Sequence, residues 1–218
     1  MRSENYLYLG EVETLKMRDN ESNVIVGAKA QGKSGFARKV IDTCYNPATQ
    51  RILVVTQTDP PAYSDMQRIN SLQKLATWKG NGMVKFYSDG DPFAMMRGLV
   101  QLAQRGVLKN GLIVFEDCTN YIDPNPDRSV KNFLVNHRMY NLDLLYTTHA
   151  VKFVPPFFWK MINSVTVFKT LDTFTNEKDL ERRQIPNATA VYEAWRKVMQ
   201  HGKIPGFIQY HLTVKTGL

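Results

Sequence analysis

One short segment limits the possible folds of this chain more than any other: residues 23–41, with the sequence NVIVGAKAQGKSGFARKVI. It opens with an apolar, β-branched run, continues with Gly27-Ala-Lys-Ala-Gln-Gly32-Lys33-Ser34, and ends in an amphipathic stretch. The middle part satisfies the pattern G-x-x-x-x-G-K-[ST], which has physical meaning when a strand precedes it and a helix follows it. The segment therefore predicts a strand, a phosphate-binding loop and a helix, with a chance glycine-rich turn as the alternative.

The residue types in this loop suit a bound phosphate. Gly27 and Gly32 let the backbone wrap so that successive N–H groups point inward, and the helix that follows adds partial positive charge. The Lys33 ammonium can reach the β- and γ-phosphates, and the Ser34 hydroxyl can bind Mg²⁺. We expect a nucleotide to contact Gly27, Ala28, Lys29, Ala30, Gln31, Gly32, Lys33, Ser34 and Gly35.

Similar apolar runs recur along the chain and alternate with amphipathic stretches. The runs predict strands at residues 23–27, 51–56, 83–87, 111–116, 142–147 and 165–169. Helix-like spacing is found at residues 66–78, 94–104 and 129–139. Short buried strands that alternate with helices are typical of βαβ units, so we predict an α/β fold with three layers and a mainly parallel central sheet.

The length of 218 residues predicts one domain, residues 1–218. We place its core at about residues 20–170 and a C-terminal appendage at about residues 177–218, packed on the sheet. An extra strand is expected around residues 6–9, a helix at 188–200 and an alternating stretch at 207–214.

Composition and charge narrow the function classes. Apolar residues make up 43% and charged residues 22%, so the chain is expected to be globular, and no apolar run is long enough for a transmembrane segment. Cys44 and Cys118 are too few for a disulfide framework or a metal site. Lys and Arg exceed Asp and Glu by 28 − 20 = +8, which favours a polyanionic partner, although a basic surface without a partner is equally compatible with the count.

The strand predicted at residues 111–116 ends in two adjacent acids, Glu116 and Asp117. Acids at the end of a buried strand are the expected partners of a phosphate loop. We assign Glu116 to the Mg²⁺ side, together with Ser34, and Asp117 to activation of the attacking water, although the two roles could be exchanged. Without the phosphate loop, two solvated acids would be the simpler interpretation.

A third strand ends in Thr147, Thr148 and His149. The hydroxyl of Thr147 or Thr148 could bind the γ-phosphate or the water, and Thr148 is our candidate; a histidine at such a place more often has a structural role. Just upstream, Arg138 follows a predicted helix, where it could complete the site of a neighbouring subunit or remain a solvated helix-end cation.

The order of these elements resembles a known family. A phosphate loop, a strand ending in paired acids, Asn136-His137-Arg138 and a strand ending in Thr147-Thr148-His149 are similar to the HerA–FtsK branch of P-loop ATPases. Within it, viral genome-packaging ATPases and the zonula occludens toxin-like assembly proteins of filamentous phages look most similar, over roughly residues 20–170. The order Glu116-Asp117 departs from the commoner Asp-Glu, which leaves the identity of the catalytic acid open.

The resemblance implies a RecA/FtsK-like P-loop NTPase fold, with ATP and Mg²⁺ as cofactors. It also implies a hexameric ring with ATP sites between subunits and DNA in the channel, acting at a capsid vertex or portal. Arg138 would then be the residue that acts across the subunit boundary. Filamentous-phage assembly proteins usually carry a membrane span, so its absence from this sequence favours packaging.

The prediction is therefore an ATP-hydrolysing DNA translocase that loads a viral genome into a preformed capsid. Two alternatives stay open: an ATP-dependent assembly or switch protein of the filamentous-phage type, and a small P-loop kinase. The sequence has no pattern of a signal peptide, so we expect the protein in the host cytoplasm or associated with the virion.

Overall fold

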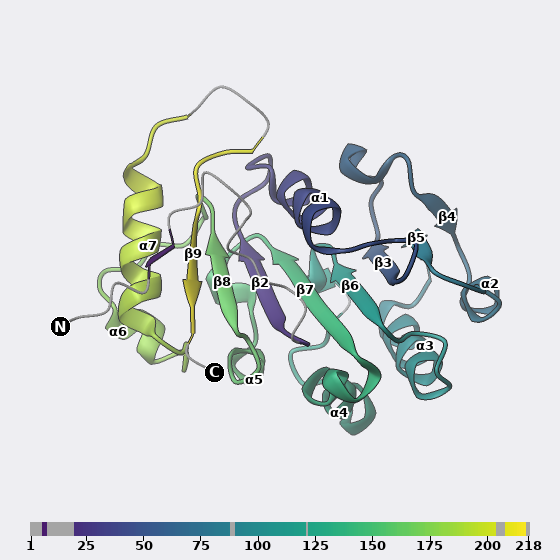
Figure 1. The fold of residues 1–218 in the computed structure, drawn as a ribbon. Coiled ribbons are helices and arrows are strands. Elements are labelled where there is room, and N and C mark those ends of the chain that lie inside the picture. Colours follow the sequence, from purple (N-terminus) through teal and green to yellow (C-terminus); the bar gives the residue numbers. More distant parts are fainter. Residues whose placement is uncertain (1–5, 8–19, 88–89, 121, 204–207, 217–218) are drawn as a thin grey trace.

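The structure is a computed structural model, and it describes residues 6–7, 20–87, 90–120, 122–203 and 208–216. A single twisted sheet crosses the molecule in the strand order β1-β9-β8-β2-β7-β6-β3-β5-β4 (Figure 1). Seven of these strands are parallel from β8 to β4, and the pairs β8–β9 and β9–β1 are antiparallel. The bounds are β1 Tyr6–Leu7, β2 Ser22–Val26, β3 Arg51–Thr56, β4 Gln67–Ile69, β5 Gly82–Tyr87, β6 Gly111–Phe115, β7 Leu142–Thr148, β8 Ser164–Val167 and β9 Leu212–Lys215.

The six predicted core strands are confirmed as β2, β3, β5, β6, β7 and β8, each within a few residues of its expected bounds. Every residue of β2, β6 and β7 is buried, because helices cover both faces of the parallel sheet. The predicted α/β fold with a mainly parallel sheet is thus confirmed.

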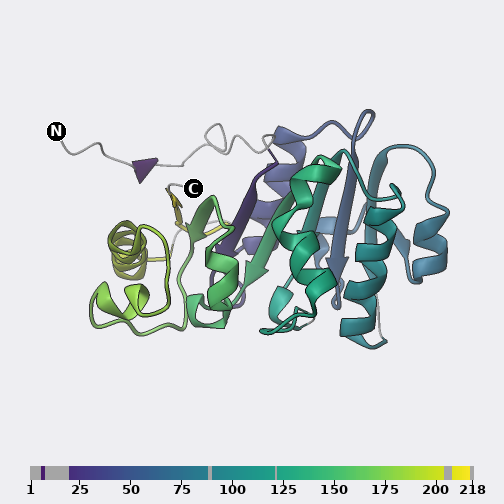
Figure 2. The same ribbon diagram turned by 90° about the horizontal axis from the view of Figure 1, so that it is seen from below.

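Two layers of helices enclose the sheet (Figure 2). One face carries α1 and the turn η2, which pack with the alternate residues of the central strands that include Ile25, Val54 and Val114. The other face carries α3, α4 and α7 over a larger apolar cluster. The bounds are α1 Lys33–Cys44, η2 Pro61–Tyr63, α2 Leu72–Ala76, α3 Pro92–Gln104, η3 Cys118–Asn120, α4 Arg128–Val135, η4 His137–Tyr140, η5 Val151–Phe153, α5 Pro156–Trp159, α6 Lys178–Glu181 and α7 Ala188–Gln200.

The prediction of a helix over residues 66–78 was wrong for the first half of that range. Residues Gln67–Ile69 form the edge strand β4, which pairs in parallel with β5. The helix α2 starts only after Ser71, whose side chain accepts a hydrogen bond from the backbone N–H of Lys74. Apolar residues recur at every third position across this region, which suggested one helix. The region instead contains a strand and a helix, with the helix cap Ser71 between them.

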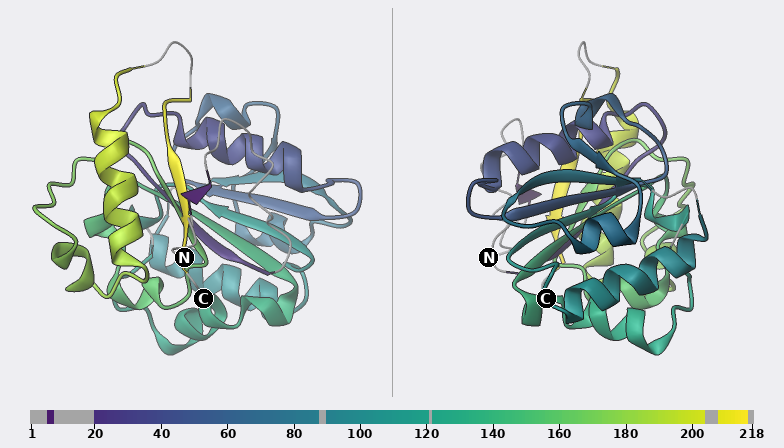
Figure 3. Two further views of the ribbon diagram at one scale, coloured as in Figure 1. Left: turned by 60° about the vertical axis from the view of Figure 1, so that its left-hand side comes forward. Right: turned by 90° about the vertical axis from the view of Figure 1, so that its right-hand side faces the viewer.

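The C-terminal tail is more closely joined to the core than expected. The predicted helix at 188–200 is confirmed as α7, and Figure 3 shows it running alongside β9. Strand β9 does not lie on the sheet but extends it, by antiparallel pairing with β8. The expected strand at 6–9 begins as β1, whereas residues 8, 9 and 207 lie outside the described residues.

Among the described residues, no helix combines the length and the apolar character that crossing a membrane would require.

Candidate nucleotide-binding site

The strand order brings three segments that carry candidate site residues to one edge of the sheet. Strand β7 lies between β2 and β6, and all three are parallel, so the segments that follow them share the carboxyl edge. A cavity with a volume of about 350 Å³ opens there. Its lining combines the phosphate loop with residues from three other segments: Lys29, Ala30, Gln31, Gly32, Lys33, Ser34, Asp117, His149 and Gln209.

The loop itself has the backbone that the glycine pattern predicted. Gly32 has φ = 88°, in the left-handed region, directly before α1 starts at Lys33. Gly27 has no room for a side chain, because a Cβ there would lie 2.6 Å from the Cβ of Phe168. The Ala28 N–H donates to the Lys169 carbonyl over 2.6 Å, which fixes the start of the loop against the end of β8.

Lys33 is buried at the base of the cavity. Its ammonium donates to the Ala28 carbonyl over 3.2 Å and lies 3.3 Å from Nδ1 of His149. Burial lowers the pKa of Lys33, while the nearby carboxylates of Asp117 and Glu116 act in the opposite direction. A negatively charged phosphate would stabilise this buried cation.

Glu116 is buried, and several donors are arranged around its carboxylate. The Tyr63 hydroxyl donates to Oε1 over 2.5 Å, and the Thr147 hydroxyl donates to Oε2 over 2.7 Å. Burial raises the pKa of Glu116, and the hydrogen bonds from Tyr63, Thr147 and Ser34 oppose that rise. The carboxylate is therefore held in one orientation and in contact with Ser34, the other residue assigned to the metal.

Asp117 turns the other way, toward the cavity. Its backbone has φ = 48°, and its N–H donates to the Thr147 hydroxyl over 2.9 Å. Its Oδ1 lies 3.3 Å from Nε2 of His149. His149 therefore contacts two site residues with one imidazole ring. Its Nδ1 lies near the Lys33 ammonium, and its Nε2 lies near Asp117, the candidate water-activating acid.

The two threonines of β7 are placed differently. Side chains alternate along a strand, so Thr147 faces Glu116 on the α1 side and Thr148 faces the opposite side. The Thr148 hydroxyl is buried without a hydrogen-bond partner among the described residues. Only the Thr148 carbonyl reaches the loop, by accepting from the Gly27 N–H over 3.0 Å. The structure thus brings the side chain of Thr147 to Glu116, whereas that of our candidate Thr148 lies on the other face of the sheet.

Arg138 lies at the opposite edge of the sheet. It belongs to η4, which precedes the amino end of β7, and its exposed side chain donates to the Asn20 carbonyl just before β2. The phosphate loop follows the carboxyl end of the same β2. Arg138 therefore does not meet the other candidate residues within this chain.

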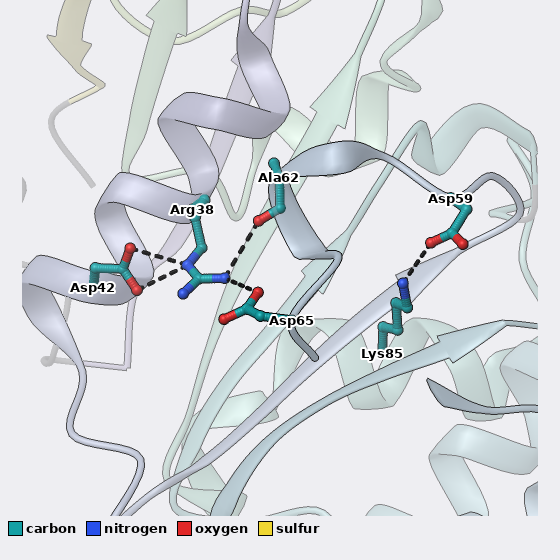
Figure 4. A network of polar contacts seen from close by, with 6 residues as sticks. All are labelled: Arg38, Asp42, Asp59, Ala62, Asp65 and Lys85. Atoms are coloured by element: carbon teal, nitrogen blue, oxygen red, sulfur yellow. Dashed lines mark hydrogen bonds and ion pairs between the residues drawn. The ribbon is translucent and has the colours of Figure 1, made fainter. Parts of the chain in front are cut away.

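Sequence reasoning missed Tyr63, which η2 brings to Glu116 from the segment after β3. A network around Arg38 of α1 holds this segment (Figure 4). The guanidinium donates to both carboxylate oxygens of Asp42, to the Ala62 carbonyl and to Asp65. A separate ion pair joins Lys85 of β5 to Asp59. Nothing in the sequence pattern linked Tyr63 to an acid far along the chain.

The donor set at Ser34 and Glu116 fits Mg²⁺. This ion prefers oxygen ligands and is usually held by one or two protein groups together with phosphates and water. In the part of the chain that the structure describes, no group of three or more His, Cys, Asp or Glu gathers as an all-protein metal site. Ser34 and Glu116, the two residues assigned to the metal from the sequence, would therefore hold the ion together with a nucleotide.

No protein-family model matches this sequence, and no curated protein matches it either. Solved structures do match the fold. The genome packaging NTPase B204 from Sulfolobus turreted icosahedral virus 2, in complex with AMPPCP, superposes with a TM-score of 0.65 at 17% identity, over 92% of this chain and 94% of that one. B204 described as the DNA-packaging ATPase of Sulfolobus turreted icosahedral virus gives 0.63 at 16%, over 92% and 94%.

A second kind of protein shares the fold at a greater distance. EssC (ATPases 2 and 3) from Geobacillus thermodenitrificans matches with a TM-score of 0.50 at 11% identity, over 90% of this chain and 39% of that chain. At these identities the likeness concerns the fold, and it agrees with the resemblance seen in the motifs. The chain therefore has the P-loop NTPase fold of the viral genome-packaging ATPases that the sequence resembles.

Proposed function

We propose that this protein is an ATP-hydrolysing DNA translocase that packages a viral genome into a preformed capsid. The observation that carries the proposal is that Lys33, Ser34 and Asp117 line one cavity at the carboxyl edge of the sheet, with the buried Glu116 in contact with Ser34. The whole-length likeness to B204, a genome packaging NTPase crystallised with AMPPCP, supports the packaging role.

In the proposed reaction, each residue acts from its observed place. Lys33 exchanges its contact with His149 for the β- and γ-phosphates. Asp117 accepts a proton from the attacking water, whose oxygen bonds to the γ-phosphorus as the bond to the β-phosphate bridging oxygen breaks. Thr147 and His149 hold Asp117 in position. Ser34 and Glu116 would hold Mg²⁺, which would supply positive charge against the phosphates.

The partners follow from the same proposal. DNA phosphates would meet a chain with a net charge of +8, and a capsid vertex or portal protein would receive the motor. Arg138 lies too far from the phosphate loop of its own chain to act there. In a homohexameric ring it would instead lie beside the nucleotide of a neighbouring subunit. The protein would work in the host cytoplasm or on the virion.

The test is ATP turnover by the purified protein with and without DNA, over a series of salt concentrations. A translocase should hydrolyse ATP several-fold faster with DNA, and the stimulation should fall steeply with salt, because phosphate contacts release counterions. Turnover that depends instead on a small phosphate acceptor would identify a kinase. Tight ATP binding with little turnover under any condition would identify a switch, and either result would refute the translocase.

A further inference from the structure

The C-terminal tail returns to the phosphate loop after α7. Residues 208–211, which we call the return segment, lie between α7 and β9 and pass the loop on the way into the sheet. The Gln209 N–H donates to the Gln31 carbonyl over 3.2 Å, so the segment holds the loop through its backbone. Gln209 also lines the cavity beside Lys33 and Ser34.

The return segment is anchored on the aromatic residues that support the loop. The His211 ring stacks on Phe168 with centroids 4.6 Å apart, and it meets Phe36 of α1 edge-on, also at 4.6 Å. Nδ1 of His211 lies 2.9 Å from the Gln209 carbonyl, which can only accept, so Nδ1 carries the proton. Ile208 packs against the same cluster as Phe36. These contacts fix Gln209 at the cavity wall.

The cavity suits the phosphate end of a ligand. Among the described residues, its lining contains no Phe, Tyr or Trp side chain against which a base could stack. Besides Gln209, it contains residues 29–34 of the loop, Asp117 and His149. In the proposed reaction Lys33, Ser34 and Asp117 serve phosphate, metal and water, and His149 orients Asp117. A carboxamide is uncharged and can donate hydrogen bonds, so it can face a polyphosphate without the repulsion that a carboxylate would cause.

From these observations we infer that Gln209 is a further polyphosphate-binding residue, supplied by the C-terminal tail. The inference rests on the proposed function and adds to it, because the sequence motifs gave the tail no part in the site. The nucleotide site is then assembled from both ends of the described chain, with the phosphate loop as the first part and the return segment as the second.

The test compares Gln209→Glu and Gln209→Ala with the wild type. Gln209→Glu keeps the size of the side chain and places a negative charge beside the phosphates. Neither change removes the backbone hydrogen bond to Gln31, so each isolates the side chain. Gln104→Glu is the matched control, because Gln104 is exposed at the far end of α3. Circular dichroism and thermal melting establish that all variants are folded.

The measured quantities are the dissociation constants for AMPPCP and for inorganic tripolyphosphate, both with Mg²⁺. We expect Gln209→Glu to weaken both ligands about tenfold or more and Gln209→Ala to weaken both several-fold, with the control unchanged. Equal binding by folded Gln209 variants and wild type would overturn the inference and leave the proposed function intact. A loss confined to AMPPCP would also overturn it, since the contact would then be to the nucleoside. A wild-type protein that binds neither ligand would refute the proposed function itself.

Discussion

The Tyr63 hydroxyl donates a 2.5 Å hydrogen bond to the buried carboxylate of Glu116. The two residues come from η2 and from the end of β6, and they meet on the α1 face of the sheet. Burial raises the pKa of Glu116, and this hydrogen bond works against the rise. Tyr63 therefore helps to keep an acid ionised where a divalent cation would need it.

Replacing Tyr63 by Phe tests that relationship. The ring would keep its place in the core, but Glu116 would lose a donor, so we expect Mg²⁺-dependent AMPPCP binding to weaken by roughly tenfold. A Mg²⁺ titration of nucleotide binding measures the effect. Tyr192→Phe is the matched control, because the Tyr192 hydroxyl bonds the Thr175 carbonyl at the surface. If the two variants require the same Mg²⁺ concentration, Tyr63 does not tune the site.

The two acids should fail in different ways. Asp117→Asn keeps the shape of the side chain but removes the proton acceptor, so nucleotide binding should persist while turnover falls by about 10²-fold or more. Glu116→Gln should weaken Mg²⁺-dependent binding as well. Paired measurements of AMPPCP affinity and steady-state ATP turnover separate the two. The opposite pattern, with Glu116→Gln binding normally but inactive, would exchange the roles.

His149 should matter for turnover and not for binding. Its ring contacts both Lys33 and Asp117, each at 3.3 Å. His149→Leu would free Lys33 for the phosphates, so AMPPCP should bind as tightly as before or more tightly. The rate of hydrolysis should fall by about tenfold, because Asp117 loses a group that orients it. Single-turnover hydrolysis measures this rate, and an unchanged rate would return His149 to a purely structural role.

Arg138 offers a test of the ring. Arg138→Ala should hydrolyse ATP slowly, since an arginine supplied across an interface can contribute roughly 10³–10⁵ in rate. Lys33→Ala should also be slow, because it removes the phosphate-loop lysine. When they are mixed before assembly, some interfaces would combine an intact loop with an intact arginine. The activity of the mixture should then exceed the sum of the separate samples. Failure to recover activity in verified mixed assemblies would exclude an arginine acting in trans.

His211 should make stability depend on pH. Burial lowers its pKa in the folded protein, with a smaller contribution from Lys39. As the pH falls below the unfolded value of about 6.5, the unfolded chain takes up the proton first, so the free energy of unfolding decreases, by at most about 1.4 kcal/mol per pH unit. His211→Phe keeps a stacked ring and should reduce this decrease. Denaturant unfolding of both proteins between pH 5 and 8 provides the comparison. If the free energy of unfolding changes with pH equally in the two proteins, His211 does not cause the pH dependence.

Local patterns were sufficient to predict the core strands and the phosphate loop. Each depends on residues close together in the sequence, such as the spacing of Gly27, Gly32 and Lys33. The contacts from Tyr63 and Gln209 could not be predicted in this way, because they join residues brought together only by the strand order. The threonine that contacts Glu116 depends on which face of β7 it occupies, and both Thr147 and Thr148 fitted the sequence pattern equally well.

Phe168 lies between the phosphate loop and the return segment, the two parts of the nucleotide site. Its Cβ fills the space beside Gly27, and its ring supports His211 in the return segment. A larger residue at position 27 would displace Phe168 and, through it, the tail. Effects of substitutions at residues that share a partner are seldom additive. Among homologous sequences, positions 27, 168 and 211 should consequently covary, although they lie far apart in the chain.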